Sequence, residues 1–127
     1  MPHIVALAVG RDPVLLETRG QVLRNAGYRV VSALSTEQAL QNFASGDFDI
    51  VILCHSIPVR ERERLTYAIH RHSPNTPVTV VTARVSAMDR FADATIENEP
   101  EILLQEIPRI LHKAPEKYQR EPQRARA

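Results

Sequence analysis

Residues 46–58 read GDFDIVILCHSIP, and this stretch decides the fold class. Its centre, residues 50–53, is a continuous apolar run with the length of a strand. Apolar runs without alternating polar residues are typical of strands that are covered on both faces, as in a parallel sheet. The run ends at Cys54 and His55, so the first functional question is whether these two side chains form a reactive pair.

The same alternation of a short apolar run and a helical period continues on both sides of this stretch. Further strands are predicted at residues 4–9, 28–33, 77–82 and 94–96. Helices are predicted to begin near residues 13, 36, 58, 83 and 100. Nine residues separate Thr82 from Ala92, so the fourth helix should be short. Five βα units with short connections favour a flavodoxin-like α/β fold: a five-stranded parallel sheet of order 2-1-3-4-5 with helices on both faces.

Residues with known roles at helix ends mark several boundaries. Asp12 and Pro13 are a cap residue followed by a proline at the first helical position. Ser35 with Gln38 three residues later fits a capping box. Pro108 lies inside the last predicted helix and should kink it or interrupt its hydrogen bonds.

The composition is that of one ordinary soluble domain. The chain has 127 residues, of which 43% are hydrophobic and 24% charged, and its formal charge is +1. The single cysteine excludes an internal disulfide and favours a reducing compartment. No apolar run is long enough to span a bilayer, and the start lacks the pattern of a signal peptide. We therefore expect a cytoplasmic protein.

The C-terminal segment differs from the rest of the chain. From Lys113 onward there are five basic and two acidic residues, a net charge of +3. Pro115 and Pro122 oppose helix formation there, and the segment has little apolar surface to bury. We predict a domain over residues 1–113 and a basic, flexible tail over residues 114–127.

Six segments, taken together in this order, resemble the receiver domain of bacterial response regulators, the CheY-like domain of two-component (phosphorelay) signalling. They are VGRDP (9–13), LRNAGYRVVSALSTEQAL (23–40), GDFDIVILCHSIP (46–58), NTPVTVVTA (75–83), FADATI (91–96) and EPEILLQEIPRIL (99–111). The resemblance covers about residues 3–111 and implies the same fold. It also implies a site at the carboxyl ends of the strands.

In that family, two acidic residues after the first strand and an aspartate ending the third hold Mg²⁺, and the aspartate accepts a phosphoryl group from a histidine kinase. A Thr or Ser ending the fourth strand and a Lys after the fifth bind the phosphoryl oxygens. The resemblance places the acidic pair at Gly10 and Arg11, the phosphoacceptor at Cys54, the hydroxyl at Thr82, the lysine at Asn98 and an aromatic switch residue at Thr95. Only Thr82 keeps the family's residue type.

These departures remove the chemistry that the family uses. Mg²⁺ prefers hard oxygen ligands, and a thiolate gives no acyl phosphate. We therefore expect neither Mg²⁺ binding nor aspartate phosphorylation. Arg11 either replaces the metal ion electrostatically or reaches into solvent. Cys54 should be a structural residue that reacts slowly, because burial in apolar surroundings disfavours the thiolate.

Other site chemistries have weaker support. Cys54 and His55 are adjacent on a strand, so they point to opposite faces and do not form a nucleophile–base dyad. The five histidines show no zinc-type spacing, and no phosphate-binding glycine loop is present, so we predict that the protein is not an enzyme. The charged run of residues 60–64, RERER, reads as a solvated helix start or, alternatively, as a partner-docking patch.

The sequence therefore predicts a stand-alone pseudo-receiver that acts by protein–protein contact without phosphorylation. The expected partner is a histidine kinase or another signalling protein, and a homodimer stays open. Two alternatives remain. One is a conventional receiver that is phosphorylated at an unusual residue. The other is a basic-tailed accessory protein of nucleic acid or a membrane surface, although the overall charge does not favour nucleic acid.

Overall fold

The computed structural model describes residues 4–83 and 89–120, with residues 113–120 described by their backbone alone. These residues form five strands and four helices. In chain order they are β1 (Val5–Val9), α1 (Pro13–Asn25), β2 (Arg29–Ala33), α2 (Thr36–Ser45), β3 (Ile50–Cys54), α3 (Val59–His72), β4 (Val78–Thr82), β5 (Ala94–Glu97) and α4 (Pro100–Arg120).

The strands form one parallel sheet in the order β2-β1-β3-β4-β5, which confirms the predicted topology. All residues of β3 and β4 are buried, as continuous apolar runs predict for central strands. In register, Val9 pairs with Leu53, Cys54 with Val81 and Thr82 with Glu97. The carboxyl ends of these strands therefore meet at one edge of the sheet.

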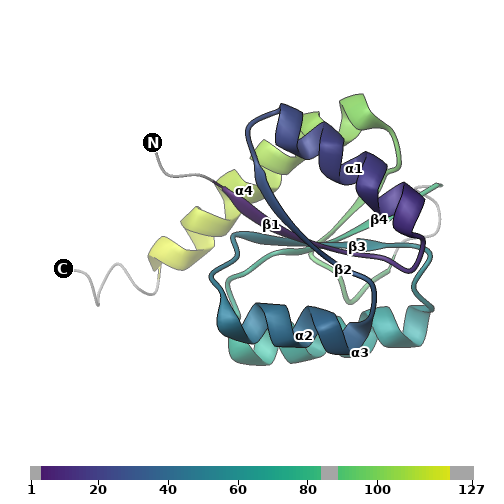
Figure 1. The fold of residues 1–127 in the computed structure, drawn as a ribbon. Coiled ribbons are helices and arrows are strands. Elements are labelled where there is room, and N and C mark those ends of the chain that lie inside the picture. The colour runs from purple at the N-terminus through teal and green to yellow at the C-terminus, as the bar shows by residue number, and fades with distance from the viewer. Residues whose placement is uncertain (1–3, 84–88, 121–127) are drawn as a thin grey trace.

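Helices cover both faces of the sheet (Figure 1), with α1 and α4 on one face and α2 and α3 on the other. Each pair closes its own apolar cluster. Leu23 of α1 joins Leu103 and Ile107 of α4 in one cluster, and Phe43 of α2 joins Leu65 of α3 in the other. The sheet is thus the middle layer of a three-layer domain. Because helices cover both of its faces, a functional site formed by the strands is expected where the strands end.

The predicted helix caps are present, with one change of partner. The Asp12 carboxylate accepts hydrogen bonds from the backbone N–H groups of Val14 and Leu15 (3.1 and 3.3 Å). The Ser35 hydroxyl accepts from the Gln38 N–H at 3.0 Å. The Gln38 side chain, however, accepts from the N–H of Leu34, at 2.7 Å, where a capping box would use that of Ser35.

The last helix is longer than the sequence suggested. It continues through Pro108 and Pro115 to Arg120, so the first residues of the predicted tail are helical and the boundary after residue 113 does not end the helix. Leu103 and Ile107 are buried, whereas Pro108 is exposed. Proline has no backbone N–H, so the helix lacks one hydrogen bond at position 108. The buried side chains of Leu103 and Ile107 nevertheless hold the helix on the sheet. None of the described helices is both long enough and apolar enough to cross a lipid bilayer.

The short helix that was predicted after β4 falls largely on residues 84–88, outside the described residues. On either side, residues 83 and 89–93 form turns, bends and coil. The rest of the predicted tail, residues 121–127, also lies outside the described residues.

Candidate functional site

The carboxyl edge of the sheet brings together four of the residues that the sequence singled out. Gly10 follows β1 and donates its N–H to the carbonyl of Ala33 (3.1 Å). Cys54 ends β3 and Thr82 ends β4, and the N–H of Asn98 donates to the Thr82 carbonyl at 2.7 Å. Thr95 lies further back, because it pairs with Val80 inside the strands.

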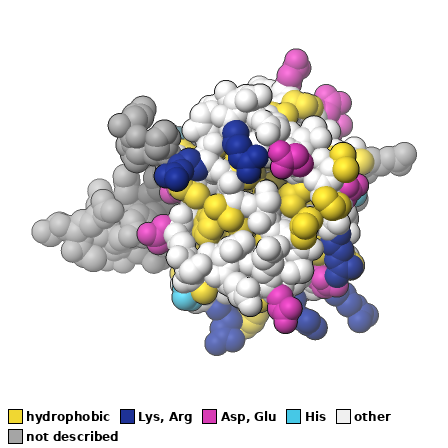
Figure 2. All heavy atoms as spheres, viewed as in Figure 1, with side chains coloured by type: hydrophobic (Ala, Val, Ile, Leu, Met, Phe, Trp, Pro, Cys, Tyr) yellow, Lys and Arg dark blue, Asp and Glu magenta, His cyan; other side chains and the backbone are white. Residues whose placement is uncertain are grey.

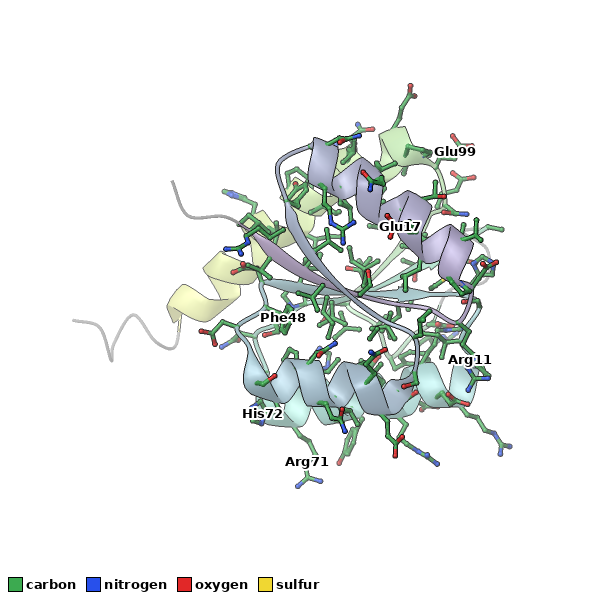
Figure 3. All side chains as sticks on the ribbon, in the orientation of Figure 1. Arg11, Glu17, Phe48, Arg71, His72 and Glu99 are labelled. Atoms are coloured by element: carbon green, nitrogen blue, oxygen red, sulfur yellow. The ribbon has the colours of Figure 1, made fainter. Side chains whose placement is uncertain are left out.

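Arg11 lies at the surface, where its side chain makes an ion pair. Its guanidinium donates to both carboxylate oxygens of Glu61 on α3, each at 2.6 Å, and its side chain is 51% exposed. Glu61 also accepts from the hydroxyl of Thr36 at 3.2 Å. Figure 3 shows Arg11 near the start of α3, at the outside of this end of the molecule. Arg11 therefore makes a surface ion pair that joins the loop after β1 to α3.

The cation of the site is Arg19, which the sequence analysis missed. This residue of α1 is only 5% exposed, and its Nη2 donates to the side-chain oxygen of Asn98 at 2.8 Å. Its Nη1 is buried and has no hydrogen-bond partner among the residues that the structure describes. Arg19 follows Leu16 by three residues and precedes Leu23 by four, and both leucines are buried. A charged residue on the buried stripe of α1 was the available signal.

Cys54 lies beside this cation. Its side chain is 1% exposed, and its sulfur accepts from the N–H of Ser56 at 3.5 Å. Burial alone would raise the pKa of the thiol. Hydrogen bonds from the side chain and backbone of Ser56, together with the positively charged guanidinium of Arg19 nearby, outweigh this and lower the pKa below its usual value. Burial does disfavour the thiolate, as expected, but the neighbouring donors and the Arg19 charge reverse the net shift. The slow reaction of Cys54 stays a prediction.

The neighbouring histidine does not act on Cys54. His55 is exposed whereas Cys54 is buried, as expected for adjacent residues at the end of a strand. The structure thus supports the prediction that the two do not form a nucleophile–base dyad.

The charged run RERER is only partly solvated. Glu61 forms the ion pair with Arg11, and the side chain of Arg62 forms hydrogen bonds within the protein. Its Nε and Nη2 donate to the two carboxylate oxygens of Asp89, at 2.7 and 3.3 Å, with side chains only 12% and 8% exposed. Its Nη1 donates to the carbonyls of His55, at 3.2 Å, and Ile57. Arg62 thereby ties the segment before β5 to the loop after β3.

The edge offers little to a hard metal ion. Gly10 and Cys54 have no carboxylate. The carboxylate that contacts Arg11 is that of Glu61, and it is already held in the ion pair with Arg11. Within the described ranges, no three His, Cys, Asp or Glu side chains gather as a metal site would require. The buried Arg19 guanidinium instead makes the edge locally positive, which suits an anion.

Comparison with known proteins decides the family. The family model described as the response regulator receiver domain matches residues 6–99. The chain belongs to the response regulator receiver family. No curated protein matches this receiver.

Solved structures show the same fold for this receiver. It is similar to the chemotaxis response regulator CheY4 of Vibrio cholerae, with a TM-score of 0.76 and 24% identity over 86% of this chain and 99% of that one. The receiver domain of an HD domain-containing protein from Pseudomonas fluorescens Pf-5 gives 0.80 and 22% over 94% and 95%. The response regulator TrrA of Thermotoga maritima, solved with the histidine kinase ThkA, gives 0.75 and 24% over 85% and 98%.

The lowered pKa of Cys54 implies a pH-dependent term in the stability of this receiver. Below the usual thiol pKa of about 8.5, and above the folded-state pKa, the unfolded chain holds a proton that the folded chain has lost. The free energy of unfolding should therefore rise with pH in this window, and the term should vanish below the folded-state pKa.

Urea unfolding of the wild type and a Cys54→Ser variant, from about pH 6 to about pH 9, measures this term. Serine has nearly the same shape and does not ionise in this range, so the wild type should gain stability relative to the variant as pH rises. A difference that stays constant or shrinks with rising pH would show that the thiolate is not stabilised.

Proposed function

We propose that this receiver has lost Mg²⁺ binding and phosphorylation and acts in two-component signalling by protein–protein contact. The observation that carries the proposal is the buried guanidinium of Arg19 beside Cys54. In the receiver family this edge gathers carboxylates around a metal ion. Here the position that corresponds to the acceptor carries a thiol, and a side chain of the protein supplies the positive charge.

Each departure from the family pattern fits the others chemically. A buried cation beside Cys54 opposes the entry of a divalent cation, because like charges repel strongly where water is excluded. Asn98 accepts a hydrogen bond from Arg19, whereas a lysine at this position would bring a second cation against it. The exchange of lysine for asparagine and the burial of Arg19 therefore support one rearranged site rather than scattered losses.

The exposed surface supports action through contact with another protein. Several large hydrophobic side chains are exposed, among them Val31 on the edge strand β2, Leu34 directly after it and Leu40 on α2. Figure 2 shows hydrophobic side chains among the charged ones on the face of the molecule that carries β2. Exposed apolar side chains on the face around β2 offer a surface for a protein partner. TrrA was solved in complex with a histidine kinase, and we propose a histidine kinase or another signalling protein as the partner here.

Incubation with acetyl phosphate and Mg²⁺, followed by intact-mass measurement, tests the loss of phosphorylation. We expect no added phosphoryl group on the wild type, because no carboxylate stands at position 54 to form an acyl phosphate. A Cys54→Ala variant is the matched control for transfer to other residues. Phosphorylation of the wild type above the level of this control would overturn the proposal and favour a conventional receiver with an unusual acceptor.

A further inference from the structure

The buried guanidinium of Arg19 lacks one hydrogen-bond acceptor. Nη2 is bonded to Asn98, but Nη1 has no acceptor within the part of the chain that the structure describes, and the residue is 5% exposed. A buried charged donor without a partner is costly, and the usual compensation is an anion. The geometry therefore calls for a negative charge next to Arg19.

The sulfur of Cys54 is the group placed to carry that charge. Arg19 lies near enough to act on it, and the Ser56 N–H donates to it at 3.5 Å. The surroundings are closely packed: a Cβ added at Gly10 would stand 3.1 Å from the Cys54 Cβ and 3.5 Å from Leu16. A sulfur atom that is already in place can carry the negative charge that Arg19 lacks.

We propose that Cys54 is a modification site, held as a thiolate against Arg19 and oxidised by hydrogen peroxide to a sulfenic acid. In this step a sulfur lone pair attacks one peroxide oxygen, a sulfur–oxygen bond forms and the oxygen–oxygen bond breaks. The sulfur loses two electrons to the peroxide, and the departing hydroxide takes up a proton to become water. The thiolate is the reactive form, so the guanidinium that stabilises it also promotes the reaction.

The product would change the hydrogen bonding of the carboxyl edge. The new oxygen offers an acceptor next to Nη1 of Arg19, on the strand end where the receiver family carries its covalent phosphoryl group. The chain holds one cysteine, so no second thiol of the same chain can resolve the sulfenic acid as a disulfide. The modified state then lasts until an external thiol reaches it. This inference does not depend on the loss of phosphorylation, which the acetyl phosphate experiment tests separately.

Peroxide treatment of the native 127-residue chain, with dimedone trapping and mass spectrometry, tests the proposal. We expect one trapped adduct at Cys54 in the wild type and none in Cys54→Ser, which retains both methionines as a control for their oxidation. Arg19→Gln should slow the oxidation at neutral pH severalfold, since loss of the guanidinium lowers the thiolate fraction of Cys54. Arg11→Gln removes a half-exposed arginine of the same region and should leave the rate unchanged.

Circular dichroism establishes that Arg19→Gln is folded. If it is not, the pH profile of the wild-type rate decides: the rate should level off below the usual thiol pKa of about 8.5. Equal rates for wild type and folded Arg19→Gln would overturn the proposal. So would a wild-type profile that levels off at or above the usual pKa, or oxidation that occurs only in denaturant.

Discussion

Replacement of Arg62 by methionine should lower the free energy of unfolding by about 3–5 kcal/mol. The Arg62 guanidinium donates four hydrogen bonds within the protein, two to the Asp89 carboxylate and two to backbone carbonyls. Methionine keeps much of the aliphatic stem but leaves the 8% exposed Asp89 side chain without its cation. A buried carboxylate that loses its partner is more costly than a lost surface pair.

Urea unfolding measures this loss, and two further variants interpret it. Arg11→Met breaks a pair whose arginine is 51% exposed and should cost no more than about 1 kcal/mol. The double variant Arg62→Met with Asp89→Leu removes both charges and should recover part of the loss, although the two backbone carbonyls stay unpaired. A loss for Arg62→Met no larger than that for Arg11→Met would mean that the buried pair does not hold the segment before β5.

Restoring a metal site should require the removal of Arg19 as well as the addition of carboxylates. Gly10→Asp, Arg11→Asp and Cys54→Asp supply the oxygen ligands that Mg²⁺ prefers, at strand ends that already meet. With Arg19 left in place, its charge competes with the ion for those carboxylates. We expect Arg19→Met, added to the three aspartates, to tighten Mg²⁺ binding by at least about tenfold, because like charges a few ångströms apart cost about 4 kcal/mol at an intermediate dielectric.

Calorimetric titration with Mg²⁺ compares the wild type, the triple variant and the quadruple variant, after melting curves show that each is folded. The wild type should show no binding. Gly10→Asp is the most demanding change, because its Cβ would approach the atom at the Cys54 Cβ position to 3.1 Å. Binding by the wild type would refute the charge argument. Equal affinities of the triple and quadruple variants would show that Arg19 does not act on this edge.

Much of the fold could be predicted because its determinants are local. Strand length, helical period and caps are set by neighbouring residues, and the continuous apolar run at residues 50–53 shows that both faces of β3 are covered. Parallel strands place their carboxyl ends at one edge, so the meeting of Gly10, Cys54, Thr82 and Asn98 followed from the topology. The length of α4 did not follow, because its course over Pro108 depends on burial of Leu103 and Ile107 against the sheet.

The electrostatics of the site depended on contacts that no local pattern records. Arg11 pairs with Glu61, 50 positions further along the chain, and Arg19 reaches Asn98, 79 positions away. A long, flexible arginine side chain can turn to solvent or into the protein, and only the packing of α1 and the strand ends selects between them. The sequence by itself determined the sheet and its order, and it places a glycine, an arginine and a cysteine at positions 10, 11 and 54. The tertiary structure alone decided which arginine is buried beside Cys54, because the sign of a thiol's pKa shift depends on the charges that folding brings next to it.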